Sequence, residues 1–407
     1  MPLKYCHSIN FGEKNMKVRP FTKDDKDSLV KMVKYCFNMS QKDSEHYIQG
    51  ALNFCKGFVA EEGGVVFSAM FYIPFHQNIH NKKFKMAGIS GVVTMPEARN
   101  RGMVREQFKA MQRDMVEQGY LTSCLEPFKP KYYQKFGWAN ASRRLRCAIN
   151  VEDIEAEKGG YEFIRIDKPT PKHFDAIEKA FASHYNGSTY RSIYFWKEEI
   201  MYPGENTKEL FCYLIRHAGK DVAYVIYNYQ KIKDEFAVNI HVRDYGFINY
   251  KGAKGLFALF KTHRDQVKDV IIGLPEDFDV FHFAPCNLNA IFCRSYMMFK
   301  VVDVKNAMLH YSIPKDIAFD FELQVSDPMM ENERLSFAFQ IDKGKIGLIE
   351  KSDHILRCSI DSFSRMFIGR SSIYDLITYG EVEISEEIIK YIDRLFPRDI
   401  VFIKDMF

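Results

Sequence analysis

The sequence has no run of apolar residues long enough to cross a membrane, which as a helix takes about 18 to 20 residues. Residues 1–15 also lack the apolar centre of a secretory signal peptide. The formal net charge of +4 on 407 residues is small. A protein dedicated to binding nucleic acid would carry a larger positive charge, although a local basic patch for phosphate groups stays possible. We therefore expect a cytoplasmic protein without a membrane span or a nucleic-acid partner.

Closely spaced cysteine pairs are missing as well. The nine cysteines are scattered and none forms a Cys-x-x-Cys motif, which is typical of reduced thiols in a reducing compartment. The one spacing that suits a metal is His76 with His80. This pair falls in a strand-and-turn stretch without acidic or thiol neighbours. A surface hairpin is the simpler interpretation, and we expect no metal site.

The composition is that of a globular protein, with 46% hydrophobic and 27% charged residues. A chain of 407 residues is too long for one ordinary hydrophobic core, so two or three domains are expected. The succession of apolar patterns divides into three blocks. We place their limits at residues 1–150, 151–304 and 305–407.

The first block begins with a strand at residues 16–22 and an amphipathic helix that follows Thr22 and Asp25, which are spaced as a capping box. Two apolar runs, 56–62 and 65–75, flank the dipeptide Gly63-Gly64. A two-glycine turn between such runs predicts an antiparallel hairpin.

The next feature is a basic loop between a strand at 84–95 and a helix that starts near Gly102. Arg99, Arg101 and Gly102 lie where the strand gives way to the helix. Helix-start amides, two arginines and a glycine that permits close approach make an anion cradle, for which pyrophosphate is the natural occupant. Taken alone, the same stretch is equally compatible with a solvated turn.

An aromatic turn follows the strand predicted at residues 121–127. It contains Tyr132, Tyr133, Phe136 and Trp138. We expect the strand before it to lie beside the strand at 84–95.

This order of elements resembles the GNAT acetyltransferases, and more closely their Eis-type (enhanced intracellular survival) branch. The stretch RNRGMV from Arg99 to Val104 is similar to the acetyl-CoA signature Q/R-x-x-G-x-G/A, with Val104 in place of the last small residue. The stretch YQKFG from Tyr133 to Gly137 is similar to the branch's Tyr-x-x-Phe-Gly. The resemblance covers the whole chain. It implies an α/β (α+β) protein with tandem GNAT folds, whose mixed, mostly antiparallel sheets are flanked by helices, followed by an α+β domain like sterol carrier proteins.

The middle block supports a duplication independently of the resemblance. Residues 249–277 repeat the succession of glycine loop, helix, strand and Leu-x-x-Glu/Asp that residues 96–127 show. Their loop contains only Lys251, Gly252, Lys254 and Gly255, so we expect this copy to bind no coenzyme.

The third block predicts an antiparallel meander over residues 335–341, 346–352 and 354–360, with helices after it. The chain ends in an apolar run in which we expect a last strand at residues 400–403. Residues 299–309 are interpreted as the bridge into this block.

The resemblance implies a site for each step of acetyl transfer. The pantetheine and the oxyanion would be held by backbone amides of the strand end, and the pyrophosphate by the basic loop. The Tyr133 hydroxyl would protonate the leaving thiolate, whereas a tyrosine that only packs is the alternative. The expected acetyl-CoA contacts are Val92, Val93, Thr94, Arg99, Arg101, Gly102, Met103 and Val104.

The resemblance also implies an unusual base, the terminal α-carboxylate of Phe407. Such a carboxylate has a reference pKa of about 3.3 to 3.7 and needs burial to become basic. Phe37, Phe84 and Asp405 are candidates for contacts with the acceptor, which we expect to be a primary amine of a small polyamine or aminoglycoside-like molecule, or an exposed lysine. The resemblance further implies a hexamer.

A function of another class stays open at this stage. The third block could bind a lipid or another small molecule, with the two preceding blocks as a scaffold without catalysis. That function predicts a continuous apolar tunnel in residues 305–407 and no binding of acetyl-CoA.

Overall fold

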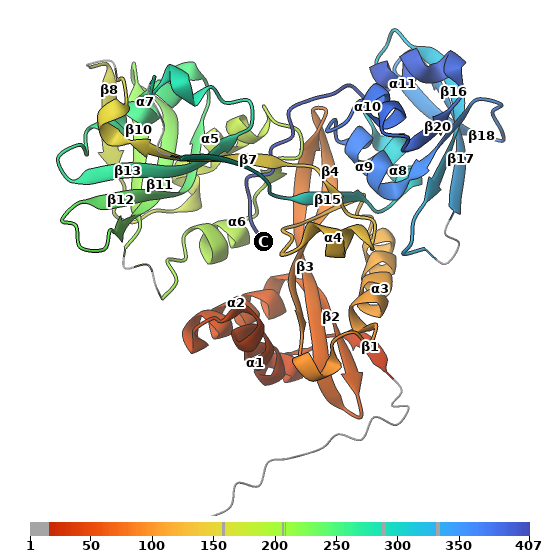
Figure 1. The fold of residues 1–407 in the computed structure, drawn as a ribbon, viewed down its shortest axis with the longest axis horizontal. Coiled ribbons are helices and arrows are strands. Elements are labelled where there is room, and N and C mark those ends of the chain that lie inside the picture. The colour runs from red at the N-terminus through yellow and green to blue at the C-terminus, as the bar shows by residue number, and fades with distance from the viewer. Residues whose placement is uncertain (1–15, 157–158, 206, 208, 286–289, 331–333) are drawn as a thin grey trace, which may run out of the picture. The chain divides into compact units, whose positions relative to one another are not determined.

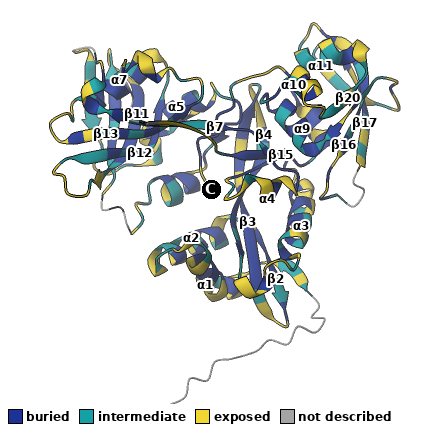
Figure 2. Ribbon diagram, viewed as in Figure 1, coloured by how far each residue is buried: buried dark blue, intermediate teal, exposed yellow. Residues whose placement is uncertain are grey.

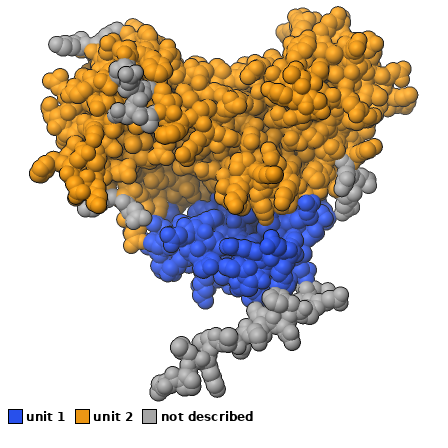
Figure 3. Space-filling model, in the orientation of Figure 1, with its two compact units in different colours: residues 1–72, 90–113 blue, residues 73–89, 114–407 orange. Residues whose placement is uncertain are grey.

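The computed structural model describes the chain except residues 1–15, 157–158, 206, 208, 286–289 and 331–333 (Figure 1). The chain divides into two compact units, coloured in Figure 3. Unit one comprises residues 1–72 and 90–113, and unit two comprises residues 73–89 and 114–407. Buried residues concentrate on the strands and on the helix faces that cover them (Figure 2).

The predicted hairpin is confirmed in unit one. Strand β2 (Lys56–Glu62) pairs antiparallel with β3 (Val65–Ile79), and β1 (Lys17–Pro20) pairs antiparallel with β2. Gly63 and Gly64 connect the strands with φ angles of 57° and 79°. Both values lie in the left-handed region that glycine adopts without strain.

Two helices belong to unit one. Helix α1 (Lys26–Phe37) was predicted, and it buries Leu29, Val30, Met32 and Val33, each worth about 1.5–3 kcal/mol. Helix α2 (Gln41–Phe54) was not predicted. Its buried residues include Ser44 and Gly50, so its sequence shows only a weak apolar period.

Strand β4 (Lys82–Thr94) and helix α3 (Met103–Glu117) contain residues of both units. Within unit two, β4 pairs parallel with β5 (Thr122–Leu125), from Met86 opposite Thr122 to Ile89 opposite Leu125. The predicted neighbourhood of these two strands is therefore confirmed. Helix α4 (Pro130–Gln134) follows β5.

The two large sheets exchange strands. Strand β15 (Met298–Val301) lies between β5 and β6 (Ala139–Asn140) in the first sheet. Strand β7 (Arg143–Asn150) instead pairs with β13 and β14 in the second sheet. The chain thus passes from the first sheet to the second before residue 150. Part of the segment 299–309, which was expected to be a bridge between blocks, is instead a strand of the first sheet. The domain limits at 150 and 304 stay a prediction.

The second sheet has the strand order β14-β7-β13-β12-β11-β10-β8. Helix α7 connects β12 to β13, which pair in parallel, as β4 and β5 do around α3. The predicted repeat is present in this form, except that the expected loop at Lys251–Gly255 belongs to α7. The elements of this region are β8 (Tyr161–Arg165), α5 (Pro171–Ala182), β9 (Thr189–Tyr190), α6 (Ile193–Phe195) with a π turn at Trp196–Ile200, β10 (Phe211–His217), β11 (Lys220–Lys231), β12 (Val238–Phe247), α7 (Tyr250–Lys261), β13 (Val267–Pro275) and β14 (Ala290–Ser295).

The third sheet has the order β18-β17-β16-β19-β20. The antiparallel pair β17–β18 was predicted, but the prediction that a third strand continues it as a meander was wrong. Strand β19 crosses over and pairs in parallel with β16, a strand the sequence analysis missed. The elements are α8 (Val304–His310), β16 (Ala318–Ser326), β17 (Arg334–Asp342), β18 (Lys345–Ile349), β19 (Ile355–Ser359), α9 (Ile360–Phe367), α10 (Ile373–Thr378), β20 (Val382–Ile384) and α11 (Ile389–Leu395).

The predicted last strand at 400–403 was also wrong. The segment is buried and extended, but only Val401 forms a bridge, in parallel with Asn186. At this bridge the Asn186 amide donates to the Ile400 carbonyl at 3.0 Å, and the Phe402 amide donates to the Asn186 carbonyl at 2.9 Å. The Ile403 amide donates to Ser142 Oγ, and the Phe402 carbonyl accepts from Ser188 Oγ. One bridge and two loop hydroxyls thus take the place of a strand ladder.

Candidate functional site

The basic loop of unit one opens helix α3. Asn100 and Gly102 have φ angles of 63° and 80°, and α3 begins at Met103. A Cβ added at Gly102 would have no atom within 4 Å, so the space above the helix start is open. The first amides of an α-helix have no partner within the helix. The loop can therefore present backbone donors to an anion.

Both arginines of the loop are held by neighbours. Arg99 is exposed, and its Nε donates to the Thr94 carbonyl at 3.3 Å. Arg101 pairs with the buried carboxylate of Glu62. The guanidinium of Arg99 is thus attached at one edge while it faces solvent.

The strand end before the loop is bent at Gly91. This residue has a φ of 63°, and a Cβ there would lie 2.3 Å from the Phe71 ring. Only glycine meets both conditions. The predicted contacts Val92, Val93 and Thr94 follow the bend and come after the last β4–β5 pair. The sequence analysis missed Gly91, although a glycine inside a strand is a signal for a bulge.

Tyr133 lies on α4 of unit two and is 3% exposed. Its ring meets those of Phe128 and Tyr132 edge to face, with centroids 5.5 and 5.3 Å away. Burial, with a smaller contribution from Tyr132, raises the pKa of Tyr133 well above its ordinary value. The hydroxyl therefore stays protonated at neutral pH and can donate a proton.

The turn after Tyr133 is fixed by residues between positions 300 and 360. Gly137 has a φ of 89°, and a Cβ there would lie 2.6 Å from Ile360 of α9. The Phe136 carbonyl accepts from Lys300 Nζ at 2.9 Å. Lys300 also pairs with the buried Asp327 at 2.9 Å. The Tyr-x-x-Phe-Gly motif thus needs glycine at position 137, because a side chain there would clash with Ile360.

Phe407 lies on strands β3 and β4 within unit two. Its ring centroid is 5.1 Å from that of Phe75, which in turn meets Phe195 at 4.9 Å. A Cβ added at Gly88 would come within 2.9 Å of the Phe407 ring. The glycine therefore provides the space that the terminal side chain fills.

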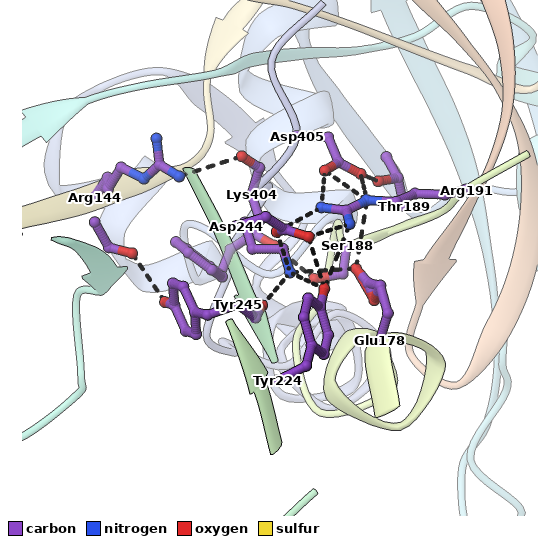
Figure 4. Close-up of polar contacts among 12 residues, drawn as sticks. Arg144, Glu178, Ser188, Thr189, Arg191, Tyr224, Asp244, Tyr245, Lys404 and Asp405 are labelled. Carbon is purple, nitrogen blue, oxygen red and sulfur yellow. Dashed lines mark hydrogen bonds and ion pairs between the residues drawn. The ribbon is translucent and has the colours of Figure 1, made fainter. Parts of the chain in front are cut away.

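A buried ion cluster holds the two residues that precede Met406 (Figure 4). Asp405 accepts from Arg191 Nε at 2.9 Å and from the Thr189 hydroxyl. Arg191 also binds Asp244 through both terminal nitrogens, at 2.6 and 2.9 Å. Lys404 donates to the Tyr245 carbonyl at 2.6 Å and pairs with Asp244 at 3.0 Å.

The charges of this cluster depend on one another. Burial opposes the ionisation of Asp244, but Arg191 and Lys404 hold its pKa well below the usual range. Burial also opposes the charge on Arg191, and its acidic partners raise its pKa. Burial raises the pKa of the neighbouring Glu178 despite both cations. The cluster joins the chain end to α5, β9 and β12.

Replacing Arg191 by methionine should lower the thermal unfolding midpoint by roughly 10 °C. The loss of the guanidinium leaves Asp244 and Asp405 as buried charges with one cation, which costs about 3–5 kcal/mol. Scanning calorimetry measures the change. Arg216→Met, which breaks exposed pairs on β10, is the control and should shift the midpoint by less than about 2 °C. Equal midpoints for the two variants would contradict the structural role of the cluster.

The three candidate acceptor contacts lie in different surroundings. Asp405 has its charge balanced by Arg191. Phe84 is fully buried, edge to face with His310 and Phe367. Phe37 is 45% exposed and meets Tyr47 edge to face in unit one. Sequence reasoning missed Arg191, Asp244 and Lys404, since charged residues at distant positions give no local signal of pairing.

Among the described residues, no group of three or more His, Cys, Asp or Glu side chains is placed to hold a metal ion. Within that same part of the chain, no helix is long and apolar enough to span a membrane.

Three family models match successive stretches of the chain. Residues 17–141 match an acetyltransferase (GNAT) domain, and residues 187–301 match a second GNAT domain model. The chain is a tandem GNAT acetyltransferase. Residues 304–403 match a sterol carrier protein domain, which completes the Eis-type order of this tandem GNAT acetyltransferase. The basic loop and Tyr133 belong to the first GNAT domain, and Arg191 and Asp244 belong to the second.

Solved structures share the fold of this tandem GNAT protein over nearly its whole length. A conserved protein of unknown function from Enterococcus faecalis, described as a probable N-acyltransferase, matches with a TM-score of 0.86 and 19% identity, over 97% of this chain and 100% of its own. A GCN5-related N-acetyltransferase from Anabaena variabilis gives the same values. Eis1 from Mycobacterium abscessus matches with a TM-score of 0.76 and 15% identity, over 97% and 100%. No match was found among curated protein sequences.

Proposed function

We propose that this protein transfers the acetyl group of acetyl-CoA to a primary amine. The observation that carries the proposal is the open helix start at Gly102, with exposed Arg99 beside it, inside a GNAT domain. The loop donates backbone N–H groups and a guanidinium to the pyrophosphate. Amides of Val92 to Thr94 hold the pantetheine and stabilise the oxyanion.

Two proton transfers accompany the reaction. The terminal carboxylate of Phe407 takes a proton from the acceptor ammonium, whose reference pKa is about 10.4. The amine nitrogen then attacks the thioester carbonyl. A C–N bond forms, the C–S bond breaks, and Tyr133 gives its proton to the departing thiolate. The attacking nitrogen loses its second proton, which converts the tyrosinate back to tyrosine, and the carboxylate releases its proton to solvent, so that an amide, CoA thiol and one proton result.

The surroundings of Phe407 support its role as base. Its ring is seated on Phe75 above Gly88, and the ion cluster holds Lys404 and Asp405 just before it. Positioning of this kind provides much of the acceleration in group transfer. We retain as proposals a hexamer, which the resemblance implies, and a cytoplasmic location, which the sequence predicts. Light scattering of the purified protein tests the first.

The binding step is tested with Arg99→Gln. We expect the Kd for acetyl-CoA to rise about tenfold, because one charge-assisted hydrogen bond to phosphate is lost. Isothermal titration calorimetry measures the change. Lys109→Gln is the control: it removes a cation from the same helix about 10 Å from its start and should leave the Kd unchanged.

A thermal-shift experiment separates catalysis from lipid carriage. Acetyl-CoA should raise the unfolding midpoint of the wild type, and fatty acids should not. Stabilisation by fatty acids alone would favour a lipid-binding protein without transferase activity.

A further inference from the structure

A large cavity within unit two leads to the chain end. Its volume is about 1200 Å³. One wall is a face of the second sheet, and the rest includes Glu126 and Pro127 after β5 together with Asp405 and Met406. Phe195 also lines it and contacts Phe75, on which the Phe407 ring rests. The cavity therefore reaches the residue next to the proposed base.

The sheet face in this cavity is basic. Arg144 and Arg146 alternate along β7, and Arg294 of β14 lies opposite Arg144 in the register. His241 and Arg243 alternate in the same way along β12. Because side chains two apart share a face of a strand, these cations gather on one wall.

Arg144 crosses the neighbouring strand to reach the cavity. A Cβ at Gly273 of β13 would lie 2.3 Å from Arg144 Nε, so only glycine lets the side chain pass. The guanidinium lies over the Tyr296 ring at 4.3 Å. It also donates to the Lys404 carbonyl at 3.4 Å (Figure 4). Arg144 Nε is buried and has no hydrogen-bond partner among the described residues. This N–H group can therefore donate to an acceptor in the cavity.

The acidic residues that line the cavity offset this wall only in part. Burial raises the pKa of Glu199 to about 7, and burial raises that of Glu126 despite Arg144. Glu209 pairs with Arg165. Burial and the neighbouring arginines lower the pKa of His241, so this ring stays neutral at pH 7.

Lys231 adds a further cation to the lining, and the charges of the ion cluster cancel. Arg191 and Lys404 offset Asp244 and Asp405 in the ion cluster. A surplus of positive charge therefore remains at Arg144, Arg146, Arg243 and Arg294.

We propose that the acceptor is a primary amine that also carries an anionic group, a carboxylate or a phosphate, which binds to Arg144 and Arg146 while the amine lies toward Phe407. This inference rests on the proposed function and replaces the polycationic acceptor expected from the resemblance. A polycation would place like charges against the arginine wall, which destabilises binding.

Matched amine pairs test the acceptor class. Glucosamine 6-phosphate is compared with glucosamine, and lysine with cadaverine, in an assay of CoA release. We expect kcat/KM at least tenfold higher for the anionic member of one pair or both. In Arg144→Gln and in Arg146→Gln, the KM for that member should rise about tenfold, with kcat and the KM of its partner within twofold. Arg264→Gln, an exposed arginine away from the cavity lining, should behave as wild type.

The outcomes separate the two proposals. Transfer to glucosamine or cadaverine that equals or exceeds transfer to the anionic partners, without an effect of Arg144→Gln or Arg146→Gln, overturns the acceptor class and leaves the transferase intact. Absence of transfer to every amine overturns the proposed function and this inference with it. Circular dichroism of both variants excludes misfolding as the cause of a raised KM.

Discussion

A protein extended by one glycine after Phe407 should lose at least 99% of its turnover, while its Kd for acetyl-CoA stays within twofold of wild type. The added residue moves the terminal carboxylate by about 3.5 Å and leaves an amide carbonyl at Phe407. An amide oxygen does not accept the ammonium proton at neutral pH. The cluster around Lys404 and Asp405 fixes the chain just before Phe407, so the segment has little freedom to compensate.

Steady-state kinetics and calorimetry with acetyl-CoA measure the two quantities. The matched control is a single glycine added at the N-terminus. We also expect Phe407→Leu to keep more activity than the extended protein, because it retains the carboxylate and loses only ring contacts with Phe75. Full turnover in the extended protein would remove the terminal carboxylate from the mechanism and leave Phe407 as a packing residue.

The second large effect is expected for Tyr133→Phe, with kcat reduced about 10²- to 10⁴-fold, the usual range for one positioned acid. The ring and its contacts with Phe128 and Tyr132 are retained, so the unfolding midpoint and the acetyl-CoA Kd should change little. Tyr132→Phe is the control, since it removes a neighbouring hydroxyl from the same helix.

The pH profile of the wild type provides a second measurement for Tyr133. Burial raises its pKa above the ordinary value near 10, so the protonated acid persists as pH rises through 10. No loss of kcat from ionisation of Tyr133 is therefore expected below pH 10. A wild-type kcat in Tyr133→Phe would show that solvent, and not Tyr133, donates the proton to the thiolate.

Local patterns were sufficient for several elements. The turn at Gly63-Gly64 predicted its hairpin because two glycines accept left-handed φ angles. The apolar period of α1 predicted its buried face. The basic stretch from Arg99 to Gly102 predicted a loop that opens a helix.

Other elements depended on distant partners. Strand β19 pairs in parallel with β16 across a crossover, and no local pattern distinguishes this from a meander. Residues 400–403 are as apolar as a strand, but their backbone bonds go to residues such as Ser142 and Ser188. Helix α2 is stabilised by its cap at Ser40 and by packing that its weak period did not reveal.

The sequence alone determined the α/β class, the duplicated GNAT pattern and the candidates Arg99, Gly102, Tyr133 and Phe407, because turns, helix starts and short motifs are local properties. Only the tertiary structure decided what surrounds the chain end. Arg191 pairs with Asp244, 53 positions away, and with Asp405, 214 positions away. The basic wall around Arg144 likewise joins residues that are distant in the sequence. Their charges interact strongly only after folding removes them from water and brings them together.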